Sequence, residues 1–345
     1  MLNFYGTIKK KRKERTMITL KKQQGRDFVV LNLSDIHLTP DEWSLEHKNG
    51  KIANHTLNEL FQRVKPDLVT ISGDLVWCGD YTALDILASK LDEFGVPYAP
   101  VWGNHDQDGG TDKLIGAEDV LKKHPLFTYE RGPEGLGYGN YVVAVEEDGK
   151  IIHAFIMMDS HDHAHCYDSE GKEIFAWGTT PAWGKLYPEQ VEWYSQQVKA
   201  LKDMGCNEST IIMHIPCYEY RVAFSSAYKS EFGKITLAES HDPKYWNEGH
   251  EGSFGVANEG ICSFPADDGV FQAILEGDHT KNVLVGHDHV NCFSVMHKGV
   301  RLSFSIKMGA GAYWTPELNG GSTFTVDTHG KSTLAHEIVD VSHLL

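Results

Sequence analysis

Six short apolar runs, each of which stops abruptly at polar residues, constrain the fold of this chain more than any other feature of its sequence. Continuous apolar runs of this length are typical of strands that are buried on both faces of a sheet. The pattern therefore predicts a buried sheet whose strands all end at polar turns. The six runs span 28–33, 68–71, 96–102, 151–158, 211–213 and 283–285.

Helix-like segments separate several of these runs. Apolar residues recur at helical spacing over 52–65, 82–94 and 188–204. The first segment ends before Pro66, and the third begins with Pro188 in its first turn. Alternation of strand and helix predicts an α/β core.

The pattern changes in the last quarter of the chain. The apolar runs 293–297 and 300–306 are separated by Lys298-Gly299, which predicts a hairpin. Further strands are expected over 323–326 and 332–339. The whole pattern indicates a layered α/β sandwich with mixed sheets.

Length and composition fit one large domain with a polar N-terminal extension. The chain has 345 residues, of which 41% are hydrophobic, so a single domain over 17–345 can bury a sizeable core. Residues 1–16 are basic, and we expect them to lack structure.

No apolar run approaches the ~18 residues that span a bilayer, and the first 20 residues lack the features of a secretory signal. We therefore expect a soluble, cytoplasmic protein.

The net charge is −16, which makes nucleic acid an unfavourable partner, because an acidic surface repels phosphate backbones. The six cysteines form no CxxC pair, so we expect reduced thiols rather than a disulfide framework.

The polar residues at the strand ends are of one chemical kind. They are Asp, Asn and His, and no cysteine accompanies them. Such residues at the carboxyl ends of buried strands are placed where α/β proteins bind ligands, and their donor atoms suit Mn, Fe or Zn. The absence of thiolates argues against a closed structural zinc site. The set comprises Asp35, His37, Asp74, Asn104, His105, His214, His287 and His289.

The spacing of these residues is as informative as their type. Asp35 and His37 are two residues apart, so on an extended segment both side chains point the same way and can grip one ion. His287 and His289 repeat this spacing. Asp74 follows a glycine, where a bare backbone lets ions approach closely, and its carboxylate can bridge two ions. Each motif alone occurs by chance, but the ordered set is specific.

The ordered set DxH, GD, GNHD, His before Pro and GHxH resembles the calcineurin-like metallophosphoesterases, over about 27–310. The resemblance implies a four-layer sandwich of two mixed β-sheets flanked by helices, with a dinuclear metal centre. It also implies the role of each residue. Asp35, His37, Asp74 and His289 would hold the first ion; Asp74, Asn104, His214 and His287 would hold the second; His105 would be the catalytic histidine.

The stretches at 187–194, 214–220 and 258–271 resemble the purple-acid-phosphatase-like branch of that family. Two positions depart from that branch. Trp77 stands where purple enzymes have a tyrosine ligand, and His37 stands where they have glycine. Other members of the family place an aspartate at the position of Trp77 to orient the catalytic histidine, so the group that orients His105 is left open.

These features predict a hydrolase of small phosphate esters in which two Mn, Fe or Zn ions activate a water that attacks phosphorus. We expect a phosphomonoesterase. The alternatives are a phosphodiesterase acting on cyclic nucleotides or other small diesters, and a non-catalytic scaffold that metal stabilises.

A loop at about 217–262 is expected to shape the substrate site, and the oligomeric state stays open. Further substrate contacts are predicted from Asp106, His161, Tyr218 and Arg221.

Overall fold

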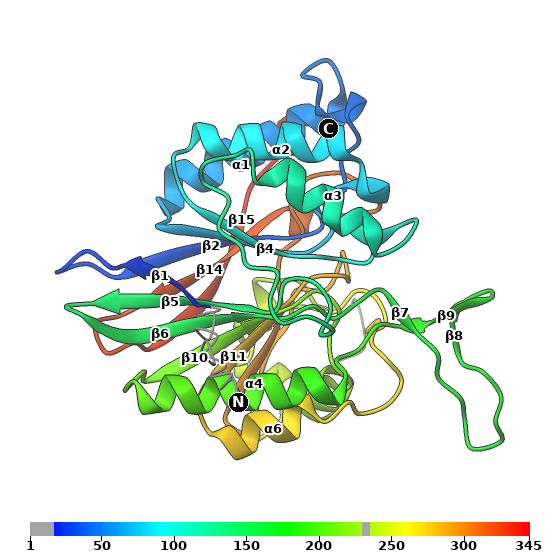
Figure 1. Ribbon diagram of the computed structural model, residues 1–345. Helices are drawn as coiled ribbons and strands as arrows, with labels where there is room; N and C mark the ends of the chain where they lie inside the picture. Colours follow the sequence, from blue (N-terminus) through cyan, green and yellow to red (C-terminus); the bar gives the residue numbers. More distant parts are fainter. Residues whose placement is uncertain (1–16, 230–234) are drawn as a thin grey trace, which may run out of the picture.

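The computed structural model describes residues 17–229 and 235–345, and it stacks two large β-sheets face to face (Figure 1). One sheet has seven strands in the order β1-β5-β6-β10-β11-β13-β12, and the other has five in the order β15-β14-β2-β3-β4. The seven strands are, in that order, Met17–Lys21, Tyr141–Glu147, Lys150–Met157, Glu208–Ile212, Thr280–Val285, Val300–Phe304 and Ser294–His297. The five strands are, in their order, Ser332–Ile338, Gly320–Val326, Phe28–Leu33, Leu68–Ser72 and Tyr98–Val101.

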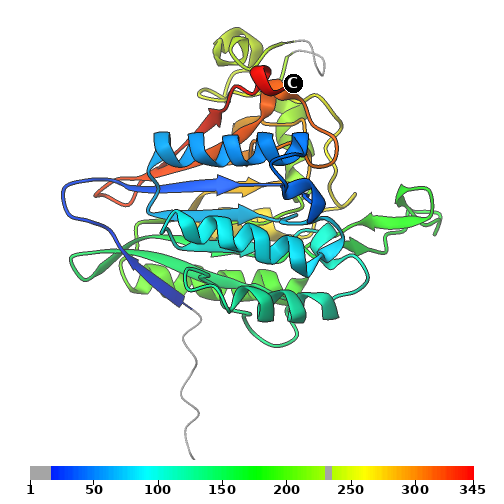
Figure 2. The same ribbon diagram turned by 90° about the horizontal axis from the view of Figure 1, so that it is seen from above.

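Helices cover the outer face of each sheet (Figures 1 and 2). The five-stranded sheet carries α1 (Lys48–Val64), α2 (Tyr81–Glu93) and α3 (Asp112–Leu121). The seven-stranded sheet carries α4 (Pro188–Asp203), α5 (Glu219–Ala227) and α6 (Val270–Gly277). The predicted four-layer sandwich is therefore confirmed.

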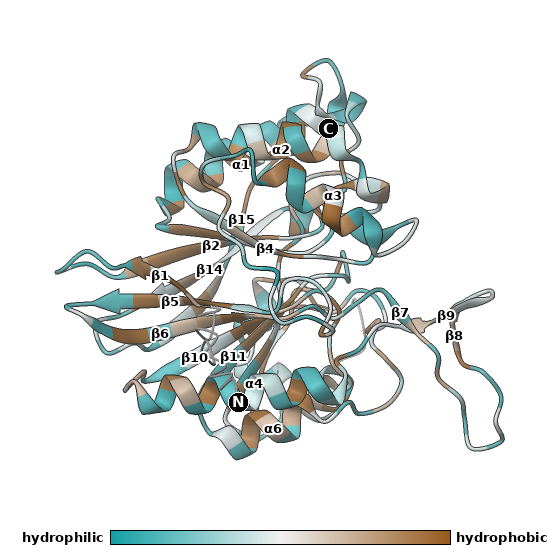
Figure 3. Cartoon of the chain, viewed as in Figure 1, coloured by the Kyte–Doolittle hydropathy of each residue, from teal (hydrophilic) through white to brown (hydrophobic). Residues whose placement is uncertain are grey.

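Apolar side chains fill the space between the two sheets. Phe28, Phe155 and Phe324 are among the buried residues of this layer. The strand ribbons in the middle of the molecule are accordingly coloured hydrophobic, while the helices show hydrophilic colours on their outer sides (Figure 3). Strands buried on both faces explain the continuous apolar runs in the sequence.

Parallel pairing gathers the strand ends at one edge. β2, β3 and β4 run parallel to one another in one sheet, and β6, β10 and β11 do so in the other. Two backbone hydrogen bonds join the turns that follow these strands: Asp35 N–H donates to Gly73 O (3.1 Å), and Gly286 N–H donates to His214 O (3.1 Å). The polar residues after five strands thus come together.

The segment 217–262 is not one long loop in the part that the structure describes, so this expectation is corrected. It contains α5, whose buried residues Tyr220, Ala223, Phe224 and Ala227 recur at helical spacing. Trp246 packs into the same core. The segment is a packed layer because its apolar side chains cover the seven-stranded sheet. Within its described residues, Arg221 and the end of the segment at 260–262 line cavities beside the strand-end site.

A third, small sheet has the order β7-β9-β8 (His163–Ala164, Thr180–Trp183 and Phe175–Trp177) and projects from one side of the sandwich (Figure 1). The basic extension 1–16 lies outside the described residues. Within the described ranges, no helix has the length and hydropathy of a membrane span. All six cysteines are free, as expected.

Candidate metal centre

Eight predicted residues meet at the carboxyl edge of the two sheets. Asp35 and His37 follow β2, and Asp74 follows β3. The remaining five follow β4, β10 and β11: Asn104, His105, His214, His287 and His289. All except His105 are buried, so the sequence prediction that these residues form one cluster is matched by their positions.

The first group of candidate ligands consists of Asp35, His37, Asp74 and His289. His37 Nε2 lies 3.3 Å from Asp74 Oδ2 and 3.0 Å from His289 Nε2. His289 Nε2 lies 3.6 Å from Asp35 Oδ1. Two carboxylates and two imidazoles therefore converge on one point.

The second group shares Asp74 with the first. His214 Nε2 lies 3.2 Å from Asp74 Oδ2 and 3.0 Å from Asn104 Oδ1. It also lies 3.3 Å from His287 Nδ1. Because Asp74 Oδ2 is close to the Nε2 atoms of both His37 and His214, one carboxylate oxygen stands between the two groups.

Hydrogen bonds outside the cluster fix which nitrogens face it. His289 Nδ1 donates to Tyr313 O (2.8 Å), and His214 Nδ1 donates to Ser72 O (2.8 Å). Each bond leaves the Nε2 lone pair directed into the cluster, as in histidines that bind metals. His214 Nε2 then faces the oxygens of Asp74 and Asn104, an arrangement that a cation between them satisfies.

The electrostatics of the cluster favour neutral imidazoles at three of its four histidine ligands. Although burial opposes it, the charge of Asp74 and the hydrogen bond to that carboxylate raise the pKa of the fourth, His214, to about 9. Burial lowers the pKa of His37, His287 and His289 well below the usual value, and a neutral ring is the form that binds metal. Burial alone would raise the pKa of Asp74, but His214 and His37 hold it well below its usual range. The residues present thus fit two first-row metal ions.

The backbone brings these residues together by left-handed turns, not by the extended segment that the two-residue spacing suggested. Asp35 has φ 54°, His37 φ 56°, Asp74 φ 51° and His287 φ 78°. This conformation costs roughly 1–2 kcal/mol for a residue with a side chain, and such strain gathers at functional sites.

The glycine before Asp74 also has a different role from the expected one. A Cβ at Gly73 would overlap the ring of His214, so this glycine makes room for a ligand and not for an ion.

His105 stands at the edge of the cluster, with a side chain that is 26% exposed. Its Nδ1 lies 2.8 Å from Asp108 Oδ2, and its backbone N–H donates to Asp74 Oδ1 (2.8 Å). The indole of Trp77 stacks on its ring, with centroids 4.4 Å apart and planes at 22°. Although burial opposes it, the hydrogen bond to Asp108 and the charge of Asp74 raise the pKa of His105.

Asp108 is therefore the residue positioned to orient His105. The sequence analysis did not identify Asp108. The two residues are three apart across η3 (His105–Gln107), a short 3₁₀ helix, and this spacing is the signal that could have found Asp108. The neighbouring Asp106 faces away. Its carboxylate accepts from the backbone N–H groups of Val76 (3.2 Å) and Gly103 (2.8 Å).

The other predicted contact residues are dispersed. His161 Nε2 lies 2.9 Å from Gln190 Oε1 at the start of α4. Tyr218 is partly buried at the residue before α5. Arg221, in contrast, lines a cavity beside the cluster. Only Arg221 of these residues reaches a cavity next to the candidate ligands.

A cavity of about 110 Å³ lies over the ligands, and Asp74, His105 and His287 line it. Four residues that the sequence analysis did not name as site residues also line it: Trp183, Cys262, Ala312 and Tyr313. Lys307 was also missed. It is buried behind the cluster and donates to the carbonyl of Asp35, and burial lowers its pKa to about 8.

Comparison with known proteins agrees with this geometry. Residues 28–291 match the calcineurin-like phosphoesterase family. The chain is 24% identical to "Probable inactive purple acid phosphatase 28" of Arabidopsis thaliana, over 90% of this chain and 77% of that protein. It is 22% identical to "Phosphatase DCR2" of Saccharomyces cerevisiae, over 86% of this chain and 50% of that protein.

Among solved structures, a dimetal phosphatase from Danio rerio superposes with a TM-score of 0.55 at 13% identity, covering 90% of this chain and 98% of that one. This likeness shows a shared fold. The family match covers most of the chain, including all seven candidate ligands and His105. From the match and the clustered ligands together, the chain belongs to the calcineurin-like phosphoesterase family, whose members are metal-dependent hydrolases of phosphate esters.

Proposed function

We propose that this protein is a phosphomonoesterase with two metal ions, each Mn, Fe or Zn. Asp35, His37, Asp74 and His289 would hold one ion; Asp74, Asn104, His214 and His287 would hold the other. When bound, such ions bind phosphate oxygens as Lewis acids and make water a better nucleophile. The protein's own residues supply the proton transfer and the choice of substrate.

The size of the cavity over the ligands carries the choice of a monoester. Its volume is about 110 Å³, below the roughly 300 Å³ at the lower end of small-molecule sites. A phosphoryl group with one substituent fits this cavity if the substituent extends into a neighbouring space. A diester needs room for a second substituent as well. The walls formed by Trp77, Trp183 and Tyr313 limit that room.

His105 is placed to help the leaving group. Its ring lines the cavity, and its raised pKa favours the protonated form, which can donate a proton to the departing oxygen. Asp108 and Trp77 hold the ring in place from two sides. His105 is therefore the proposed catalytic acid, and Asp108 and Trp77 are proposed positioning residues.

The Arabidopsis relative is named as probably inactive, so a non-catalytic scaffold is the alternative of another class. Two features of this chain support catalysis. Seven candidate ligands converge in two groups around Asp74, and His105 keeps both a partner and access to the cavity. The expected partner is a small phosphate ester. The net charge of −16 disfavours nucleic acid.

A comparison of two substrates tests the proposal. After metal reconstitution, kcat/KM for p-nitrophenyl phosphate should exceed that for bis(p-nitrophenyl) phosphate at least tenfold, which corresponds to ~1.4 kcal/mol of differential transition-state binding. A tenfold preference for the diester would establish the phosphodiesterase alternative instead. No turnover of either ester by protein with two ions per chain would support the scaffold.

His105→Ala separates catalysis from metal binding. This variant should keep both ions and lose roughly 10²–10⁴-fold in rate. The loss should be smaller for aryl phosphates than for alkyl phosphates, because an aryl leaving group needs less protonation. Loss of the ions would show that His105 serves the metal centre instead.

A further inference from the structure

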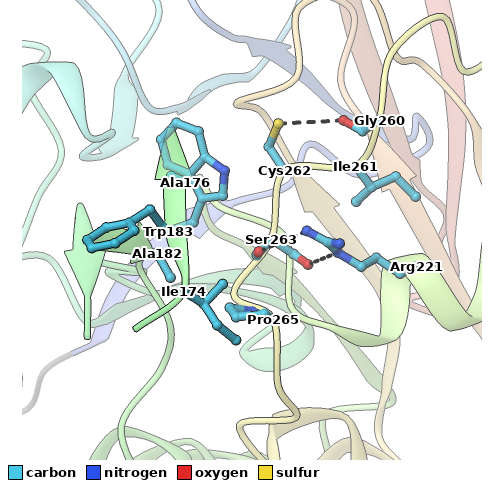
Figure 4. Close-up of a pocket in the computed structure, with 11 residues that line it drawn as sticks. Ile174, Ala176, Ala182, Trp183, Arg221, Gly260, Ile261, Cys262, Ser263 and Pro265 are labelled. Carbon is cyan, nitrogen blue, oxygen red and sulfur yellow. Dashed lines mark hydrogen bonds between the residues drawn. The ribbon is translucent and has the colours of Figure 1, made fainter. Parts of the chain in front are cut away.

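A second cavity, of about 330 Å³, is drawn in Figure 4. It shares lining residues with the cavity over the ligands. One wall comes from the small sheet β7-β9-β8 and contributes Ala176 and Trp183. The opposite wall is the segment 260–265, which contributes Ile261 and Cys262. Its volume falls at the lower end of the roughly 300–1,000 Å³ typical of small-molecule sites.

The two cavities adjoin at Trp183 and Cys262, which line both. The ring of Trp183 meets that of the candidate ligand His287 edge to face, with centroids 4.2 Å apart and planes at 84°. The two cavities are therefore neighbours at Trp183, on the side of the candidate ligand His287. The larger cavity is the neighbouring space that a monoester's single substituent requires.

The lining of the larger cavity is apolar and aromatic, with one cation. Trp183 and Ile261 offer flat and apolar surface. Arg221, from α5, also lines the cavity, and its guanidinium is fixed by Ser263: Nε donates to Ser263 Oγ (2.7 Å) and Nη2 to Ser263 O (3.1 Å) (Figure 4). Within the described residues, no carboxylate pairs with Arg221, so its remaining N–H groups are available to a ligand.

The small sheet that forms one wall is anchored to the opposite wall. Ala164 and Ala182, from the sheet, are buried against Phe264 of the segment 260–265. Lys185 Nζ lies 4.5 Å above the ring of Phe264. The two walls thus contact each other directly, which helps to hold them in place.

We propose that this cavity binds the leaving group of the substrate, and that this group is a planar aromatic ring that carries a hydrogen-bond acceptor. The ring packs against Trp183, since aromatic rings favour offset or edge-to-face contact, and the acceptor takes hydrogen bonds from Arg221. Nucleoside and tyrosine-like alcohols share this chemistry. The inference rests on the proposed phosphomonoesterase function and names its substrate class.

Three monoesters test the inference on the metal-reconstituted full chain: adenosine 5′-monophosphate, phosphotyrosine and glycerol phosphate. At least one ring-bearing ester should have a kcat/KM at least tenfold above that of glycerol phosphate. In Ala176→Trp, which fills the cavity, this ratio should fall towards one. Arg221→Gln should lower it at least threefold. Ala200→Trp, on the exposed face of α4, is the matched control and should leave the ratio unchanged.

A binding measurement provides a readout that does not depend on turnover. Calorimetry with adenosine and with N-acetyl-tyrosinamide shows which source of the ring is preferred, and Ala176→Trp should weaken the better ligand at least tenfold. Equal hydrolysis of all three esters, with no effect of Ala176→Trp, would overturn the inference and leave the phosphomonoesterase intact. If no monoester is hydrolysed, the proposed function fails, and unchanged ligand binding in Ala176→Trp would overturn the inference too.

Discussion

Nδ1 of His105 lies 2.8 Å from a carboxylate oxygen of Asp108, three residues further along the same short turn. One face of the imidazole is covered by Trp77, the residue at the position where purple enzymes have a metal-binding tyrosine. A carboxylate on one nitrogen and an indole on one face leave little freedom to the ring. The proposed catalytic histidine is thus held by Asp108 at one nitrogen and by Trp77 at one face.

Removing this carboxylate should slow the reaction without removing metal. Asp108→Ala takes away the partner that orients His105, so kcat should fall roughly 10–100-fold, since small misplacements of a catalytic group cost up to about this much. KM and metal content should stay close to those of the wild type. The loss should be larger for alkyl than for aryl phosphates. Asp119→Ala, at an exposed position of α3, is the control, and a change in KM alone would argue against a positioning role.

Asp74 is the one residue that both ligand groups share, because its Oδ2 lies 3.3 Å from His37 Nε2 and 3.2 Å from His214 Nε2. Asp74→Asn should therefore weaken both sites, leaving less than one ion per chain after dialysis. His37→Ala should lose only the ion of the first group. Elemental analysis of the two variants side by side measures the difference. Two ions per chain in Asp74→Asn would contradict the bridging role.

The iron-loaded protein should lack the visible charge-transfer band of purple enzymes. Trp77 supplies no phenolate. Tyr313 lines the cavity over the candidate ligands, but its ring and hydroxyl already have other partners. Its ring stacks on His289 at 4.1 Å, its hydroxyl donates to Glu259 Oε2 (2.9 Å), and burial raises its pKa. Absorption spectra after iron loading check this. A purple protein would mean that a tyrosine has become a ligand, and Tyr313→Phe would then show whether it is Tyr313.

The sequence predicted the parts of this site that depend on local patterns. Runs such as 28–33 and 68–71 end where the ligands begin, because a buried strand must be apolar and the turn after it must not be. Other parts depend on tertiary contacts. The left-handed conformation of Asp35 and His37 has no glycine to signal it. Likewise, α5 is short, and its burial depends on the sheet that it covers.

The large cavity illustrates the same limit. Trp183 and Arg221 are 38 positions apart and lie on separate elements, β9 and α5. Only the packing of the small sheet against the segment 260–265 brings them to one space. A tryptophan in a short polar stretch is more often simply packed at the surface. The sequence could therefore not distinguish such a residue from one that lines a substrate site.

Acid should destabilise the fold through buried neutral histidines. His153 on β6 is fully buried, with Nδ1 donating to Gly330 O (2.9 Å) and Nε2 3.1 Å from Thr210 Oγ1. Burial lowers its pKa from 6.5 to about 4; the Gly330 hydrogen bond and Asp327 oppose the shift, and His279 adds to it. The unfolded chain therefore binds this proton more readily. The stabilisation is complete above pH 6.5 and is lost as the pH falls towards 4, by about 3 kcal/mol for this group.

The variant His153→Gln isolates this contribution, because it keeps a polar side chain at the position but cannot titrate. The free energy of unfolding, measured by urea denaturation of the chelated protein from pH 7 to pH 4, should fall less steeply for the variant than for the wild type. Chelation matters because protonation of the ligand histidines would otherwise release metal in the same range. His343→Gln, at an exposed position near the C-terminus, should retain the wild-type slope. Parallel curves for His153→Gln and the wild type would mean that His153 binds its proton equally in the folded and unfolded chains, and its burial would then carry no pH-dependent stability.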